Sequence, residues 1–118
     1  MANPNIVNVT SIYGNTAVAA LLTTVANVIT NSSTSNNIIK INNLTVANYS
    51  NAAITTSVIL NRNGNSFYFV GSVVVPSNSS MVVVGKDTSV YLIEGDVIQA
   101  NVSANSAASL ITSFEVIN

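Results

Sequence analysis

Apolar and polar residues alternate along most of this 118-residue chain, and clusters of Asn, Ser and Gly separate the alternating stretches. A period of two residues is typical of β-strands, and the abundance of Val and Ile favours strands further. The pattern predicts short strands over 6–13, 39–46, 54–61, 66–70, 72–75, 81–84, 90–93, 97–104 and 110–117. In 54–61 the alternation is clearest, with Ile54, Thr56, Val58 and Leu60 on one face and Thr55, Ser57 and Ile59 on the other.

Glycine and asparagine mark the interruptions between these stretches. Asn63-Gly64 lies between two alternating runs and predicts a tight β-hairpin. Gly71 indicates a bend or bulge within the following strand. Residues 39–46 keep their apolar side chains on one face only if Asn42-Asn43 forms a β-bulge. Gly14-Asn15 is expected to end the first strand.

The segment 16–30 is ambiguous, because Ala17 to Leu22 could begin a helix. The Thr23-Thr24 pair and the β-branched residues that follow favour two short strands or one bent strand instead. Eight to ten short strands with no convincing helix predict an all-β fold for residues 1–118. We expect a single antiparallel β-sandwich domain that resembles a jelly roll.

Composition excludes several functions. The chain has no His and no Cys, so it lacks a His-based catalytic pair, an ordinary zinc site and any disulfide. Three basic residues are too few for a phosphate-binding groove, so we expect no nucleic-acid partner. The weakly polar segment 16–30 is too short and too rich in hydroxyl groups to span a bilayer. We therefore expect no enzyme activity, no cofactor, no metal and no membrane partner.

The four acidic residues are the candidates for catalytic or calcium-binding carboxylates. Asp87 and the Glu94-Asp96 pair flank one short predicted strand, and Glu115 lies near the C-terminus. Two carboxylates could form a glycosidase pair or join loop carbonyls around a calcium ion. We favour a third interpretation, in which acids beside Gly form turns and aid solubility.

Isolated cations and aromatic residues supply candidates for protein contacts. One of Lys40, Arg62 and Lys86 could pair with an acid at a subunit contact, and the two lysines are expected to protect edge strands from further pairing. Phe67 and Phe69 are predicted to point into the core, which leaves Tyr68 facing solvent or a partner. The candidate interface residues are Tyr68, Tyr91, Lys40 and Arg62.

Charged residues make up only 6% of the chain, against about a quarter in an ordinary soluble domain. The chain contains 19 Asn, 16 Ser and 11 Thr, so its polar surface is mostly neutral. A neutral surface of this kind does little to prevent association. It suits a subunit that packs against copies of itself or against a scaffold.

The C-terminal half resembles small virion structural proteins of tailed phages, especially those that infect cyanobacteria. The similar residues are Val75-Pro76-Ser77-Asn78-Ser79-Ser80, Val82-Val83-Val84, Lys86-Asp87-Thr88, Tyr91-Leu92-Ile93-Glu94-Gly95-Asp96, Ile98, Ala100 and 113–117. The segment 39–48 fits the same pattern, so about two-thirds of the chain is covered. Residues 1–30 lie outside it and are interpreted as an N-terminal arm or as strands contributed to a neighbour.

The resemblance implies a β-sandwich that decorates a capsid or lies at the neck or tail, without enzyme activity. The hypothesis is a capsid decoration or cement protein that stabilises the shell through many contacts. Its partners would be the major capsid protein or other virion proteins, and it would be a homo-oligomer, with a trimer as the working expectation. It would be made in the host cytoplasm and reside on the virion. The alternative is a neck, tail-fibre or host-recognition module that binds a surface glycan.

Overall fold

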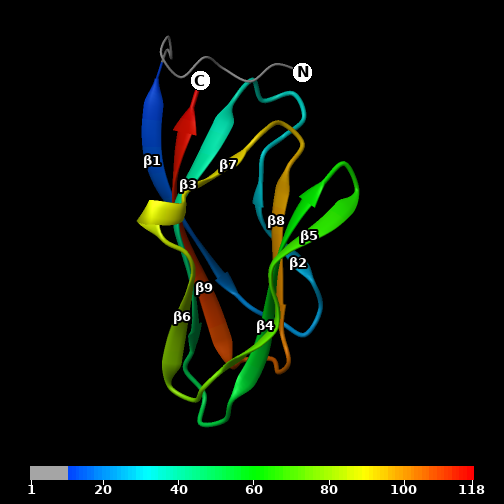
Figure 1. The fold of residues 1–118 in the computed structure, drawn as a ribbon, viewed down its shortest axis with the longest axis vertical. Helices are drawn as coiled ribbons and strands as arrows, with labels where there is room; N and C mark the ends of the chain where they lie inside the picture. The colour runs from blue at the N-terminus through cyan, green and yellow to red at the C-terminus, as the bar shows by residue number, and fades with distance from the viewer. Residues whose placement is uncertain (1–10) are drawn as a thin grey trace.

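The computed structural model describes residues 11–118, which form two antiparallel sheets packed face to face (Figure 1). The strands are β1 (Ile12–Ala20), β2 (Ala26–Thr30), β3 (Ile38–Asn48), β4 (Ile54–Arg62), β5 (Asn65–Val75), β6 (Ser79–Val84), β7 (Val90–Leu92), β8 (Val97–Val102) and β9 (Ala108–Ile117). A 3-10 turn, Lys86–Thr88, separates β6 from β7. The predicted all-β sandwich is confirmed, and 16–30 contributes to two strands rather than a helix.

The order of the strands is that of a jelly roll. The first sheet has the order β1-β9-β3-β6, and the second has the order β2-β8-β4-β5. β6 pairs with one half of β3 and β7 with the other half, so these two strands share a single edge position. Two sheets with four strand positions each, in which chain neighbours such as β1 and β2 lie in different sheets, correspond to the eight-stranded jelly roll.

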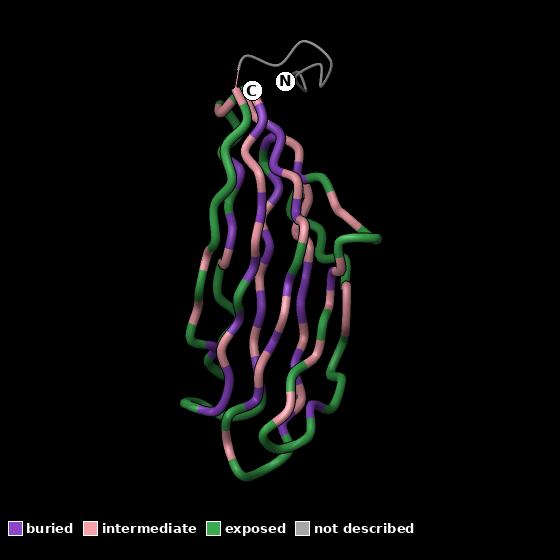
Figure 2. Tube along the Cα trace, turned by 90° about the vertical axis from the view of Figure 1, so that its left-hand side faces the viewer, coloured by how far each residue is buried: buried purple, intermediate pink, exposed green. Residues whose placement is uncertain are grey.

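Alternating side chains from both sheets fill one apolar core. Figure 2 shows buried residues alternating with more exposed ones along the strands. Inward residues of the central strands are completely enclosed, because each inner face is covered by the opposite sheet. They include Ile41, Leu44, Val46, Val58, Ile98, Ala100 and Leu110.

The predicted bulge in β3 is present. The pairing of β3 with β9 shifts register between Ile41 and Asn43. Because one extra residue is accommodated there, Ile39 and Ile41 before the bulge face the same core as Leu44 after it. The buried hydroxyl of Thr112 donates a hydrogen bond of 2.8 Å to the backbone carbonyl of Asn43 at this irregularity. The bulge therefore keeps both halves of the strand in register with one core.

The predicted hairpin between β4 and β5 is also present. Asn63 and Gly64 both have positive φ, +56° and +81°, as a type I′ turn requires. The prediction for Phe67 is wrong, since its side chain is 56% exposed. β5 is an edge strand with two shifts of register against β4, and these irregularities lift this end of the strand from the core.

The beginning of the first predicted strand, residues 6–10, lies outside the described residues. From Ile12 onward the strand is formed, but Gly14 and Asn15 do not end it. β1 continues to Ala20 with an unbroken register against β9. Pairing along one side with β9 outweighs the weak strand propensity of these two residues.

Candidate interaction surfaces

The four candidate interface residues lie in three separate places. Lys40 of β3 and Tyr91 of β7 are directly opposite each other on the outer face of the first sheet. Tyr68 is 62% exposed and projects from β5 in the second sheet. Arg62 ends β4 and is bound to an acid of the same chain. These residues therefore do not form one patch, and their role in an interface stays a prediction.

The expected edge role of the lysines is wrong for Lys40. Its strand, β3, lies between β9 and β7, so Lys40 occupies an interior position with Glu115 opposite it on β9. Its place on the outer face of the sheet, rather than at an edge, exposes its ammonium to solvent. Lys86 lies in the 3-10 turn between the two edge strands β6 and β7 rather than on a strand, so its protective role stays a prediction.

The far half of that outer face, from Asn43 onward in β3, carries no charge. Register places Val18, Ile111, Thr45 and Val82 side by side in one row across β1, β9, β3 and β6. The next row consists of small residues, and together the two rows form what we call the neutral face. The neutral face comprises Val18, Ala20, Thr45, Ala47, Ser80, Val82, Ser109 and Ile111.

Three residues of the neutral face are large and exposed. Val18 is 74% exposed, Val82 is 60% exposed and Ile111 is 48% exposed. The central strands of the opposite sheet present a different outer surface, because Asn27, Gln99 and Asn101 occupy its outward positions. The Gln99 amide donates to Asn27 Oδ1 at 2.9 Å. The neutral face thus combines exposed valine and isoleucine with small side chains, whereas the large exposed apolar residues Tyr68 and Val74 of the opposite sheet lie on its edge strand β5.

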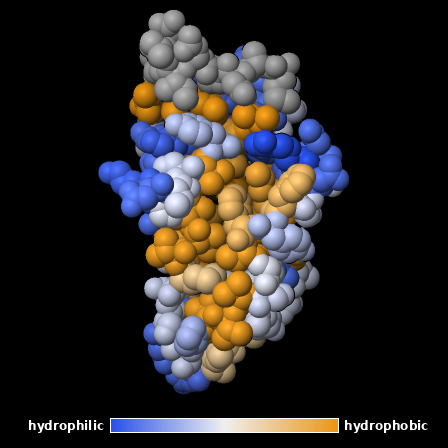
Figure 3. All heavy atoms as spheres, in the orientation of Figure 1, coloured by the Kyte–Doolittle hydropathy of each residue, from blue (hydrophilic) through white to orange (hydrophobic). Residues whose placement is uncertain are grey.

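A second apolar surface follows the side on which β5 and β6 are edge strands. Figure 3 shows this side, with apolar side chains in a band along much of its length. Val73 and Val74 of β5 are 37% and 60% exposed, and Met81 and Val83 of β6 are half-buried against the core. Core side chains therefore reach the surface along this side.

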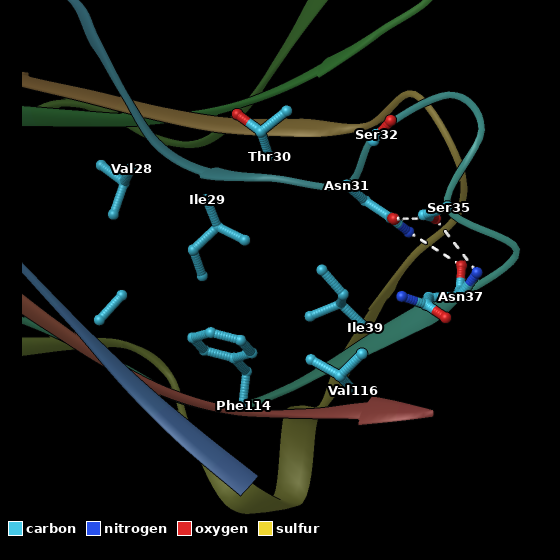
Figure 4. Close-up of a pocket in the computed structure, with 11 residues that line it drawn as sticks. Val28, Ile29, Thr30, Asn31, Ser32, Ser35, Asn37, Ile39, Phe114 and Val116 are labelled. Atoms are coloured by element: carbon cyan, nitrogen blue, oxygen red, sulfur yellow. Dashed lines mark hydrogen bonds between the residues drawn. The ribbon is translucent and has the colours of Figure 1, made fainter. Parts of the chain in front are cut away.

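The opposite side of the sandwich contains a cavity of about 430 Å³ between β1 and β2. Its wall is apolar and includes Val28, Ile29, Ile39, Phe114 and Val116, with the polar loop 31–37 at one end (Figure 4). The only residue that β1 contributes is Ala17, whose methyl group is too small to close the gap. The sandwich is therefore open along this edge.

Arg62 and Asp96 form the one ion pair found within residues 11–118. Arg62 Nε donates to Asp96 Oδ1 at 2.9 Å and Nη2 donates to Oδ2 at 2.6 Å. The amide of Ile93 also donates to Asp96 Oδ2 at 2.9 Å. The hydrogen bonds that Arg62 donates to Asp96 raise the pKa of Arg62, burial of the guanidinium opposes this, and the negative charge of Asp96 raises the pKa further. The pair fixes the turn between β7 and β8 to the end of β4.

Glu94 and Asp96 lie in the turn between β7 and β8, as predicted, but the expectation that they aid solubility is wrong. Their side chains are only 4% and 1% exposed. Glu94 Oε2 accepts the amide of Asn36 at 2.9 Å, whereas Oε1 has no partner in the structure. Neither acid lines the cavity between β1 and β2. Asp96 acts as a structural group, and Asp87 remains an exposed turn residue.

Two buried asparagines have structural roles that the sequence did not reveal. Asn31 Nδ2 donates to the carbonyls of Asn37 and Leu92, at 3.0 and 2.9 Å. Asn48 Nδ2 contacts the carbonyls of Ala52, Val75 and Pro76, at 2.8, 3.0 and 3.1 Å. Both side chains are 1% exposed. With 19 Asn in the chain, spread over strands, turns and loops, no local pattern distinguishes these two.

A shallow hollow of about 410 Å³ lies at the end of β3, beside the start of β6. Tyr49, whose side chain is 55% exposed, borders it together with Asn78, Ser79 and Ser80. An exposed ring beside amide and hydroxyl groups is the chemistry that a sugar ring requires. The residues of this hollow are therefore the candidates for the glycan-binding alternative.

The described residues contain neither a metal-ligand cluster nor a membrane-spanning helix. Within residues 11–118, no three acidic, histidine or cysteine side chains gather as ligands for a metal ion. No helix in this part of the chain is long and apolar enough to cross a membrane.

Comparisons with known proteins assign no family. No protein-family model matches the chain, and no curated protein sequence matches it. A solved structure described as Bacillus endospore appendages that form a novel family of disulfide-linked pili is similar, with a TM-score of 0.46. The match has 12% sequence identity and covers 99% of this chain and 95% of that chain. At this level the likeness carries no argument about family or function.

Proposed function

We propose that this protein is a non-enzymatic virion component of a tailed phage, specifically a capsid decoration or cement protein. The resemblance of residues 75–117 to virion proteins is the reason for proposing a place on a phage particle. The neutral face supplies the contact surface, and this is the single structural observation on which the proposal rests. A flat, charge-free row four strands wide, with valine and isoleucine exposed, is suited to packing against another protein surface.

The arrangement of charge supports a scaffold-binding role. On the outer face of the first sheet, Lys40 and Glu115 lie toward one end, and the neutral face occupies the other. Docking through the neutral face would bury no ionised group, so it avoids the desolvation cost of buried charge. Affinity for the shell should then change little with ionic strength. The apolar band along β5 and β6 is a second surface, which suits a subunit that contacts more than one neighbour.

The proposal is tested first by composition of the particle. We expect the protein in purified virions at a copy number comparable with that of the major capsid protein. A reconstruction should show the neutral face against the shell. Detection of a few copies at the neck or tail alone would refute the decoration role.

The docking surface is tested by a matched pair of variants. Ile111→Lys adds a charge at a central strand of the neutral face, and Gln99→Lys adds one at a central strand of the opposite sheet. Ile111→Lys should weaken binding to empty capsids by at least about tenfold, since an unpaired charge would be buried, whereas Gln99→Lys should bind normally. Equal loss in both variants, or in neither, would contradict docking through the neutral face.

The hollow at Tyr49 supports a second candidate, a host-recognition module that binds a surface glycan. Sugar rings stack on exposed aromatic rings, and Asn78 and Ser79 would supply hydrogen bonds. A glycan array with the whole protein should then give hits that Tyr49→Ala abolishes and Tyr68→Ala retains. An array without hits would reject this candidate and leave the first unaffected.

A further inference from the structure

The free edge of β1 presents an ordered row of backbone groups. Ser11 and Asn118 exchange both backbone hydrogen bonds, at 3.3 and 3.1 Å, and the Leu21 amide donates to Ala108 at 3.0 Å. In an antiparallel pair, hydrogen-bonded residues alternate with residues that point away. Odd-numbered residues of β1 therefore bond to β9, and even-numbered residues direct their N–H and C=O groups outward.

The outward-pointing residues are Ile12, Gly14, Thr16, Val18 and Ala20. The Thr16 amide is bound by its neighbour, since it donates to Asn15 Oδ1 at 2.8 Å. Within residues 11–118, no strand pairs with this edge. A strand added here would gain a full set of backbone bonds at the cost of one local contact.

β1 also lacks the features that protect edge strands. It contains no charged residue and no proline, and its register against β9 has no shift. The other long edge strand, β5, has two shifts, and β2 has one. On the shared edge, the turn Lys86–Thr88 separates β6 from β7. Among the described strands, β1 is thus the edge best suited to pairing with another chain.

We propose that β1 pairs antiparallel with β1 of a second copy of this chain, about a two-fold axis through Thr16. This register overlaps all nine residues of the strand. It places Gly14 opposite Val18 and Ile12 opposite Ala20, so each large side chain meets a small one. The two Thr16 residues meet each other, which is a favourable cross-strand pair. Self-complementarity of size and the absence of charge select a second copy as the partner.

Pairing of this kind would connect the first sheets of two subunits into one continuous sheet. Because Val18 lies opposite Gly14 of the second copy, the row through Val18, Ile111 and Thr45 would continue into the second copy's row of Gly14, Glu115 and Lys40. The two neutral faces would therefore lie on the same side of the joined sheet, at opposite ends across the two-fold axis. The inference concerns association through the edge and does not depend on what the neutral face binds.

The first test is amide hydrogen exchange on the wild-type protein at low and high concentration. Odd-numbered amides of β1 should be protected at both concentrations. The amides of Gly14, Val18 and Ala20 should become protected only at high concentration, with at least about tenfold slower exchange. Fast exchange of these amides in a confirmed dimer would overturn the proposal. Full protection in the dilute monomer would show that another part of the same chain covers the edge, which also overturns it.

The second test uses single cysteines in this cysteine-free chain. Opposed residues in a hydrogen-bonded antiparallel pair have Cα atoms about 5.5 Å apart, which a disulfide can bridge. Thr16→Cys should form a covalent dimer under mild oxidation. Thr45→Cys, on an interior strand of the same sheet, should form no covalent dimer under the same oxidation. Equal crosslinking of both variants would overturn the assigned register and axis.

A third variant separates the edge from the neutral face. Val18→Pro removes an outward N–H without removing a bond to β9, so the fold should persist while the dimer dissociation constant rises at least about tenfold. Ile111→Lys should leave this dimer intact. If Val18→Pro does not fold, the cysteine pair still decides the question. A folded Val18→Pro protein that dimerises normally would contradict the inference.

Discussion

Arg62 and Asp96 join through two parallel hydrogen bonds and tie the end of β4 to the turn that precedes β8. Asp96 is enclosed, whereas Arg62 is 38% exposed. Because water cannot reach the Asp96 carboxylate, its negative charge is stabilised by the Arg62 guanidinium and by the Ile93 amide. Its neighbour Glu94 is enclosed as well, but one of its oxygens lacks a partner. Two acids that are two residues apart therefore have opposite expected effects on stability.

Asp96→Asn should lower the free energy of unfolding by about 2 kcal/mol, because it removes a charged acceptor that three donors share. Glu94→Gln should leave stability unchanged or raise it by up to about 1 kcal/mol. It keeps an acceptor for Asn36 and removes an incompletely solvated charge. Chemical denaturation of the two variants checks the contrast, and a similar loss in both would contradict it.

Asn48 should be intolerant of substitution although it looks like an ordinary loop residue. Its amide contacts three carbonyls, and its oxygen accepts the amide and hydroxyl of Ser50 at 3.0 and 2.7 Å. Asn48→Ala should cost about 2 kcal/mol and Asn48→Asp more, since a carboxylate would face carbonyl oxygens. Asn43→Asp, at an exposed position, should stay within about 0.5 kcal/mol of wild type in thermal and denaturant unfolding.

Deletion of Asn42 should prevent folding. Without the extra residue of the bulge, every side chain of β3 beyond it would move to the opposite face of the sheet. Leu44 and Val46, which are completely buried in the wild-type protein, would point outward in the variant. Soluble yield and far-ultraviolet circular dichroism measure this outcome. Deletion of Ser33, in an exposed loop, is the control, and a folded Asn42 deletion would disprove the proposed role of the bulge.

The hairpin turn should require glycine at position 64. Gly64 has a φ of +81°, and a Cβ added there would meet no atom within 4 Å. The cost of Gly64→Ala is therefore purely conformational, about 1 kcal/mol. Gly14→Ala is the matched control, since a Cβ there would approach only the Phe114 carbonyl, at 4.0 Å, and it should be neutral or stabilising. Equal losses in unfolding free energy would contradict the assignment.

Much of the fold follows from local pattern. Alternation predicted the strands, Asn63-Gly64 predicted the turn, and the phase change at Asn42-Asn43 predicted the bulge, because each depends on neighbours in the chain. The failures have a common cause. Phe67, Lys40, Glu94 and Asp96 were misplaced because their environments depend on which strand lies at an edge and on which turn meets which strand end.

The candidate surfaces were partly predictable. Sequence indicated a neutral exterior suited to packing, but not which face would carry it. Register alone brings Val18, Ile111, Thr45 and Val82 into one row, although Val18 and Ile111 are far apart in the chain. The hydrogen-bonding direction of β1 likewise depends on its pairing with β9.

By itself the sequence determined the fold class, the turns and the scarcity of charge, since backbone propensity and side-chain period act over a few residues. Only the tertiary structure decided that Val18, Ile111 and Val82 lie exposed together on one half of the outer face of the first sheet, that two acids are buried, and that no described strand pairs with the regular edge of β1. Those properties arise from the order of the strands, and that order is set by packing between segments distant in the chain.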